Sequence, residues 1–227
     1  MKMRKISIIL SLLLSAALAV AVYQIVQTAV TQRKEKDDFQ VLIEQVEQNK
    51  PEKETPKEPT ETPKPEVKLT RNIRPALEQN KECIGWLCIE GTNVNYPVMH
   101  TPNNPEKYLR KNFGGEYSQS GVPFLDGRCS LTDGNLIIFG HNMKNGTMFS
   151  DLKKYLDIAF RQAHKLIEFE TADGIFIFEV MDVIKTDIHN EWYNKLNSED
   201  GRCLVLSTCY GSAKSGRLLI IAKEVEP

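Results

Sequence analysis

The stretch that decides the fold is RCLVLSTCYGSAKSGRLLIIAKEV, residues 202–225. It contains two apolar runs, 202–209 and 217–225, separated by seven mostly small or polar residues. Short runs rich in Leu, Val and Ile and bounded by turn residues are typical of β-strands. If the two runs pair in the antiparallel sense, Arg217 at the start of the second strand lies near Cys209 at the end of the first.

The sequence before this stretch repeats the pattern of short apolar runs and turns. Asp173-Gly174 lies between two of the runs and predicts a β-hairpin. Eight strands with few helices indicate a mainly β fold, an eight-stranded closed or nearly closed barrel. The expected short helices cover residues 71–80, 105–111 and 148–155, and the six further strands cover residues 84–90, 93–99, 122–125, 135–140, 165–171 and 175–186.

The N-terminus carries a membrane signal. Lys2, Arg4 and Lys5 precede the uncharged segment 6–32, whose apolar core, residues 6–26, is 21 residues long. A helix needs about 20 apolar residues to cross the hydrocarbon of a bilayer. A cleaved signal peptide is the rival interpretation, but its apolar region is usually about 7–15 residues long. We therefore predict an uncleaved single-pass anchor over 1–32, with a cytoplasmic N-terminus and an extracellular remainder.

A stalk is expected between the anchor and the β-rich domain, over residues 33–68. Residues 34–50 are polar with a partial apolar stripe, which predicts a short exposed helix. Residues 51–68 contain five Pro, five Glu and four Lys, a composition that cannot bury a core. In a polyproline conformation this segment reaches roughly 55 Å. It is expected to act as a linker that lifts the catalytic domain, residues 69–227, off the membrane.

Charge and cysteine content exclude some functions. The chain has 29 basic and 30 acidic residues and a formal net charge of −1, unlike the basic surface of a nucleic-acid-binding protein. The five cysteines include no C-x-x-C pair, so no metal site is predicted. Their odd number leaves at least one unpaired thiol.

Cys209 differs from the other cysteines because an apolar strand ends there and a loop begins at Tyr210-Gly211. Such a position presents a side chain to a substrate on a rigid scaffold. A cysteine nucleophile needs a neighbouring base, most often a histidine. Arg217 could stabilise a developing oxyanion if the two strands pair.

His141 is the best candidate for the base. It follows the apolar run 135–140 directly after Gly140, so it mirrors the placement of Cys209 at a strand end. The other three histidines are assigned to a turn, to a strand start and to a solvated polar stretch, the last being the main rival: His100, His164 and His189.

These residues carry a family resemblance. Leu206-Ser207-Thr208-Cys209 resembles the cysteine motif of sortases, the membrane-anchored transpeptidases of Gram-positive bacteria, and IFGHNM at 138–143 is similar to their histidine motif. Gly216-Arg217 before the last strand also matches. Three further motifs resemble class B sortases: Ile84-Gly85-Trp86-Leu87, Tyr96-Pro97-Val98 and Thr147-Met148-Phe149. The resemblance covers residues 73–225 and implies a sortase-type barrel.

The resemblance also implies roles. Cys209 is the nucleophile that attacks the carbonyl of a threonine in a C-terminal sorting signal, and His141 is the general acid and base. Arg217 orients the signal and stabilises the oxyanion, while Ser207 and Thr208 contribute to substrate binding. No cofactor and no metal are implied.

The implied partners are a surface protein that bears a sorting signal and an amine acceptor, either a peptidoglycan precursor or a pilin lysine. The membrane is contacted through the N-terminal helix, and no nucleic acid is involved. Class B sortases carry a long helical insert between the sixth and seventh strands. The connection here, between residues 186 and 202, has only about 15 residues, so the subclass and its sorting motif stay open.

Two alternatives fit the anchor and the stalk equally well. The first is an exported cysteine peptidase, in which water replaces the amine. The second is a non-catalytic surface-binding module on a stalk. A peptidoglycan L,D-transpeptidase is disfavoured because those enzymes place histidine and glycine directly before the cysteine, where this chain has Ser207-Thr208.

Overall fold

The N-terminal helix is long and apolar. The computed structural model describes residues 2–48, 71–132, 134–197 and 201–225, in two units, Met1–Asp38 and Phe39–Pro227. The first unit is formed by helix α1 (Lys2–Gln48), which by length and composition can cross a membrane. Its apolar side chains, among them Leu14, Leu18 and Ile25, are more than half exposed. An apolar surface of this extent is typical of a helix that faces lipid.

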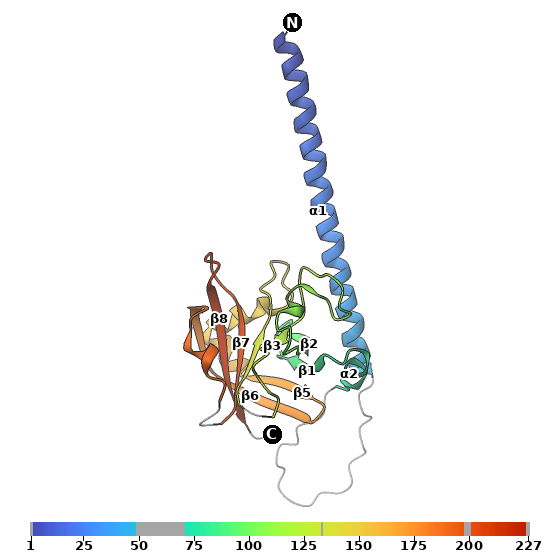
Figure 1. Ribbon diagram of the computed structural model, residues 1–227. Helices are drawn as coiled ribbons and strands as arrows, with labels where there is room; N and C mark the ends of the chain where they lie inside the picture. Colours follow the sequence, from blue (N-terminus) through green and yellow to red (C-terminus); the bar gives the residue numbers. More distant parts are fainter. Residues whose placement is uncertain (1, 49–70, 133, 198–200, 226–227) are drawn as a thin grey trace, which may run out of the picture. The chain divides into compact units, whose positions relative to one another are not determined.

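The second unit contains eight strands that close into a barrel in the order β1-β2-β3-β4-β7-β8-β6-β5 (Figure 1). The pairs β2–β3 and β4–β7 are parallel, and the other six pairs are antiparallel. Closure leaves no unpaired sheet edge. The strands are β1 (Cys83–Cys88), β2 (Asn95–Met99), β3 (Phe124–Leu125), β4 (Leu136–Phe139), β5 (Leu166–Thr171), β6 (Gly174–Asp187), β7 (Cys203–Cys209) and β8 (Gly216–Val225).

All eight predicted strands are present, so the predicted fold class is confirmed. The predicted hairpin is also confirmed, because β5 and β6 pair up to Thr171 and Gly174, and Gly174 has a φ of 137°. The helices expected over 71–80, 105–111 and 148–155 appear as shorter elements: α2 (Arg74–Gln79), η1 (Lys107–Arg110) and η2 (Phe149–Leu156).

Two short helices were not predicted. One is α3 (Ile158–Ala163), which begins where the Asp157 carboxylate accepts hydrogen bonds from the Ala159 and Phe160 N–H groups. The other is η3 (Glu191–Asn194), in the connection between β6 and β7. Both span one or two turns, which is too short for a hydrophobic period to be recognised in the sequence.

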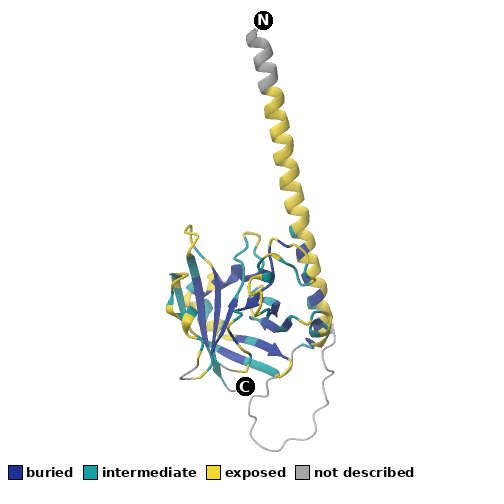
Figure 2. Ribbon diagram, viewed as in Figure 1, coloured by how far each residue is buried: buried dark blue, intermediate teal, exposed yellow. Residues whose placement is uncertain are grey.

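The core is formed by the interior of the barrel, drawn dark blue in Figure 2. β4 and β7 lie side by side in its most apolar part, and the first six residues of β7 are buried while its last residue, Cys209, is exposed. This strand therefore runs from the core to the surface and ends at the thiol.

The last turns of α1 belong to the second unit and pack on the barrel. Phe39, Leu42 and Val46 are buried, and the Phe39 ring meets the Tyr96 ring edge to face at 5.4 Å between centroids. The Val46 carbonyl also accepts a hydrogen bond from the Asn72 N–H at 3.0 Å. The prediction of an exposed helix over 34–50 is therefore wrong on this face. The Pro-rich linker expected over 51–68 lies outside the described residues.

This packing predicts that Phe39→Ala destabilises the folded domain. The substitution removes a buried ring that contacts Tyr96, so the free energy of unfolding should fall by about 3 kcal/mol. Chemical denaturation of the full chain in detergent micelles measures the change. Val41→Ala on the exposed side of the same helix is the control, and equal effects of the two substitutions would contradict the packing.

Candidate active site

Cys209 and Arg217 lie opposite each other at the end of the β7–β8 ladder. Residues directly opposite in an antiparallel pair project from the same face, so the thiol and the guanidinium share one side of the sheet. Thr186 of β6 pairs with Arg217 on its other side. The prediction that strand pairing brings Arg217 to Cys209 is confirmed.

His141 reaches the same place through the parallel pairing of β4 with β7. Phe139 is in register with Ser207, and the Gly140 N–H donates to the Ser207 carbonyl at 3.1 Å. Position 140 requires glycine because a Cβ there would lie 2.6 Å from the Phe149 ring. One residue further on, His141 stands beside Cys209.

Two side chains hold the end of β7 against this segment. The Thr208 hydroxyl donates to the Gly140 carbonyl at 2.7 Å, and the Asn142 amide donates to the Cys209 carbonyl at 2.9 Å. The backbone of Cys209 is therefore tied to the residues before and after His141. This arrangement orients both side chains without a direct bond between them.

The imidazole of His141 is oriented by a backbone carbonyl. Its Nε2 lies 2.9 Å from the Leu109 carbonyl oxygen, which can only accept, so Nε2 carries the proton and Nδ1 is the free basic nitrogen. Burial lowers the pKa of His141 below its ordinary value of 6.5; the bond to Leu109 opposes this and the nearby Arg110 adds to it. The resting imidazole is therefore neutral near pH 7.

Arg217 is fixed by its own loop. Its Nη1 donates to the carbonyls of Lys214 and Gly216 at 3.0 and 2.9 Å. A guanidinium carries five N–H groups, so this anchoring leaves others to bind a substrate oxygen. The side chain is half-buried, which places a fixed positive charge beside the thiol.

Cys209 is the exposed cysteine among five free thiols. Burial raises the pKa of Cys83 to about 11 and also raises the pKa of Cys88, Cys129 and Cys203. Those four thiols are held in the unreactive protonated form. Cys209 alone has both exposure and a neighbouring base.

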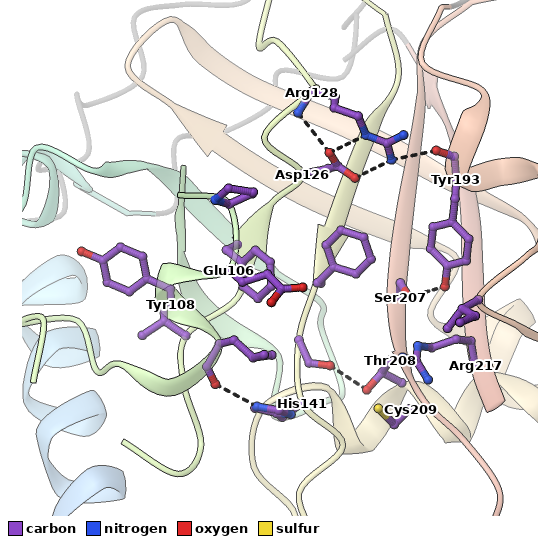
Figure 3. Close-up of a pocket in the computed structure, with 17 residues that line it drawn as sticks. Glu106, Tyr108, Asp126, Arg128, His141, Tyr193, Ser207, Thr208, Cys209 and Arg217 are labelled. Atoms are coloured by element: carbon purple, nitrogen blue, oxygen red, sulfur yellow. Dashed lines mark hydrogen bonds and ion pairs between the residues drawn. The ribbon is translucent and has the colours of Figure 1, made fainter. Parts of the chain in front are cut away.

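These three residues line a cavity of about 460 Å³ (Figure 3). Ser207 and Thr208 line it as well, but both are buried and both hydroxyls have protein partners, Ser207 with Tyr193 at 2.7 Å and Thr208 with Gly140. Their assignment to substrate binding stays a prediction. The three other histidines are absent from the described wall of the cavity.

Tyr193 of η3 is a site residue that the sequence did not reveal. Its hydroxyl bonds to Ser207, its ring stacks on Phe139 at 6.0 Å, and its carbonyl accepts a hydrogen bond from Arg128 at 2.9 Å. Arg128 in turn makes a bidentate ion pair with Asp126. It lies in the polar stretch IHNEWYN, where nothing marks the tyrosine as part of a cavity wall.

The described residues contain no group of three or more His, Cys, Asp or Glu side chains that could hold a metal ion. The chemistry available to this cavity is therefore that of a thiol, an imidazole and a guanidinium. Such a set is suited to acyl transfer through a covalent thioester.

Comparison with known proteins places these residues in a family context. The sequence profile of the sortase domain matches residues 87–225. The chain is 27% identical over 259 residues to sortase B of Staphylococcus aureus, covering all of this chain and 99% of the relative. The crystal structure of sortase B from B. anthracis in complex with AAEK1 matches 86% of this chain and 99% of its own, at 25% identity and a TM-score of 0.63. A Staphylococcus aureus sortase B–substrate complex matches 68% and 84% of the two chains, at 29% identity and a TM-score of 0.58.

The environment of His141 predicts a pH dependence. Because burial favours the neutral imidazole, the unfolded state binds more protons just below pH 6.5. The free energy of unfolding should therefore decrease as the pH falls from 7 towards the pKa of the folded state, and this contribution levels off below that pKa. Urea denaturation at several pH values measures the slope.

His141→Gln is the matched variant for this measurement, because its amide can still donate to Leu109 while it does not titrate. It should show a smaller loss of stability between pH 7 and pH 5. An NMR titration should place the midpoint of His141 below 6.5. An unchanged slope together with a midpoint above 6.5 would contradict the neutral resting state.

Proposed function

Because this chain belongs to the sortase family, whose members are cysteine transpeptidases, we propose that Cys209, His141 and Arg217 perform the transpeptidation. The observation that carries the proposal is the common placement of the three side chains at the ends of β4, β7 and β8. All three lie within the matched domain. Membership of a transpeptidase family leaves no observation in favour of a hydrolytic peptidase or a binding module.

The first half-reaction forms a thioester. The thiol proton passes to the free nitrogen of His141, and the Cys209 sulfur bonds to the carbonyl carbon of a threonine in the sorting signal. Arg217 donates hydrogen bonds to the oxyanion of the tetrahedral intermediate, where a fixed donor is most effective. The C–N bond then breaks, and the leaving amine takes the proton from His141.

The second half-reaction uses an amine as the acceptor. Its nitrogen attacks the thioester carbon, its proton passes to His141, and the Cys209 sulfur leaves and is protonated again. The donor is a surface protein with a C-terminal sorting signal, in line with the substrate-bound relative. The acceptor is proposed to be an amine of a peptidoglycan precursor or a lysine of a pilin subunit.

Sortases are cell-surface enzymes, and the apolar part of α1 fits a membrane anchor. We propose that α1 crosses the cell membrane once, with the N-terminus in the cytoplasm and the barrel outside. Lys2, Arg4 and Lys5 precede the apolar segment, and such charges favour the cytoplasmic side.

The assigned roles predict the behaviour of three variants in a peptide-transfer assay. Cys209→Ala should form no acyl product, and His141→Ala should lose both half-reactions. Arg217→Lys should lower kcat about 100-fold, since one flexible ammonium replaces a fixed planar donor. The assay supplies a library of sorting-signal peptides with oligoglycine and identifies products by mass spectrometry.

Circular dichroism of each variant is the control for folding. Acyl product from Cys209→Ala would remove the assignment of the nucleophile. Full activity of a folded Arg217→Lys would remove the proposed oxyanion contact.

The proposed topology is testable because Cys209 is exposed while the other cysteines are buried or half-buried. A membrane-impermeant maleimide should label the chain in intact protoplasts, and Cys209→Ser should remove the label. Labelling only after lysis would contradict an extracellular barrel. Recovery of the labelled chain in the supernatant, without its N-terminus, would indicate a cleaved signal peptide instead of an anchor.

A further inference from the structure

The charges that line the catalytic cavity are unevenly satisfied. Four fully charged side chains lie on its described wall: Glu106, Asp126, Arg128 and Arg217. Asp126 and Arg128 neutralise each other through two bonds of 2.9 and 2.7 Å. Arg217 is held by two backbone carbonyls and is assigned to the reaction. Within the described part of the chain, Glu106 has neither an ion pair nor a side-chain hydrogen bond.

The lysine next to Glu106 does not neutralise it. The Lys107 ammonium lies 2.6 Å from both carboxylate oxygens of Glu82, which also accepts a bond from the Tyr108 hydroxyl. This network draws the Lys107 charge away from the cavity. Figure 3 shows the Glu106 side chain on the cavity wall, with its carboxylate free of the dashed contacts that hold its neighbours.

The position of Glu106 is fixed relative to His141. Its carbonyl accepts a hydrogen bond from the Leu109 N–H at 3.0 Å, which forms the turn η1, and the Leu109 carbonyl holds the imidazole. With a rise of about 2 Å per residue in such a turn, the two positions lie about 6 Å apart. An extended peptide advances about 3.3 Å per residue, so this separation corresponds to about two residues of substrate.

A peptide that lies in the cavity removes water from this carboxylate. Desolvating a charge without a partner costs free energy, whereas a cationic side chain of the peptide supplies a charge-assisted hydrogen bond. We propose that Glu106 is a specificity-determining residue, which selects sorting signals with Lys or Arg within about two residues of the scissile threonine. The proposal rests on the transpeptidase function proposed above and names the class of signal that this cavity takes.

A charge-swap experiment on the full chain in detergent tests it. The probes are internally quenched peptides with a fixed scissile threonine and Lys, Gln or Glu at each of the three preceding positions and the one following. At one position, the native enzyme should cleave the Lys peptide with a kcat/KM about fivefold above that of the Gln peptide. Glu106→Gln should abolish this preference, and Glu106→Lys should invert it so that the Glu peptide is cleaved best.

Glu90→Gln is the matched control, because it removes an exposed carboxylate that lies outside the cavity wall. It should leave the Lys preference unchanged. A native enzyme that cleaves the peptides without a Lys preference, or a preference that survives both Glu106 substitutions, overturns the assignment of Glu106. A native enzyme that cleaves none of the peptides, whatever their charge, contradicts the proposed function and this inference together.

Discussion

The catalytic arrangement depends on the parallel pairing of β4 with β7. Four consecutive pairs, from Leu136 with Leu204 to Phe139 with Ser207, bring the two strands to the same edge of the barrel in step. Their apolar side chains are buried, so a slip of one residue would turn the core-facing set outward and is strongly disfavoured. The register that fills the core is therefore also the register that sets His141 beside Cys209.

Much of this could be predicted from local sequence. The apolar runs that end at Cys209 and at Gly140 identify two strand ends with chemistry at them, and the hairpin-like stretch 202–225 places Arg217 opposite the thiol. The β4–β7 pairing could not be derived from periodicity, because it joins segments more than 60 residues apart and a local pattern carries no register between distant strands. The Leu109 carbonyl that orients His141 is also invisible in sequence, since every residue has one. The stripe containing Phe39 and Val46 was interpreted as exposed because its partner surface is formed only in the folded barrel.

The short connection between β6 and β7 explains why Tyr193 has so many contacts. Sequence resemblance to class B sortases leads one to expect a long helical insert there, yet the helix described in this connection is the four-residue η3. So short an element has little core of its own and is held from outside, by Arg128 at its backbone and by Phe139 and Ser207 at its tyrosine. The Asp126–Arg128 pair thus fixes one wall of the cavity, which is also why its charges are unavailable to a substrate.

The same wall bears on how the proposed reaction moves its proton. Burial disfavours the charged imidazole of His141, and a transfer from Cys209 creates that charge together with a thiolate beside the Arg217 guanidinium. The new ion pair and the Leu109 carbonyl, which binds a charged donor more strongly than a neutral one, both offset the cost of charging the buried ring. A peptide that fills the cavity excludes water and strengthens these interactions further, since they then operate at a lower effective dielectric constant. In this mechanism the reactive thiolate is favoured when the sorting signal is in place, and the charged imidazole persists only until the leaving amine takes its proton.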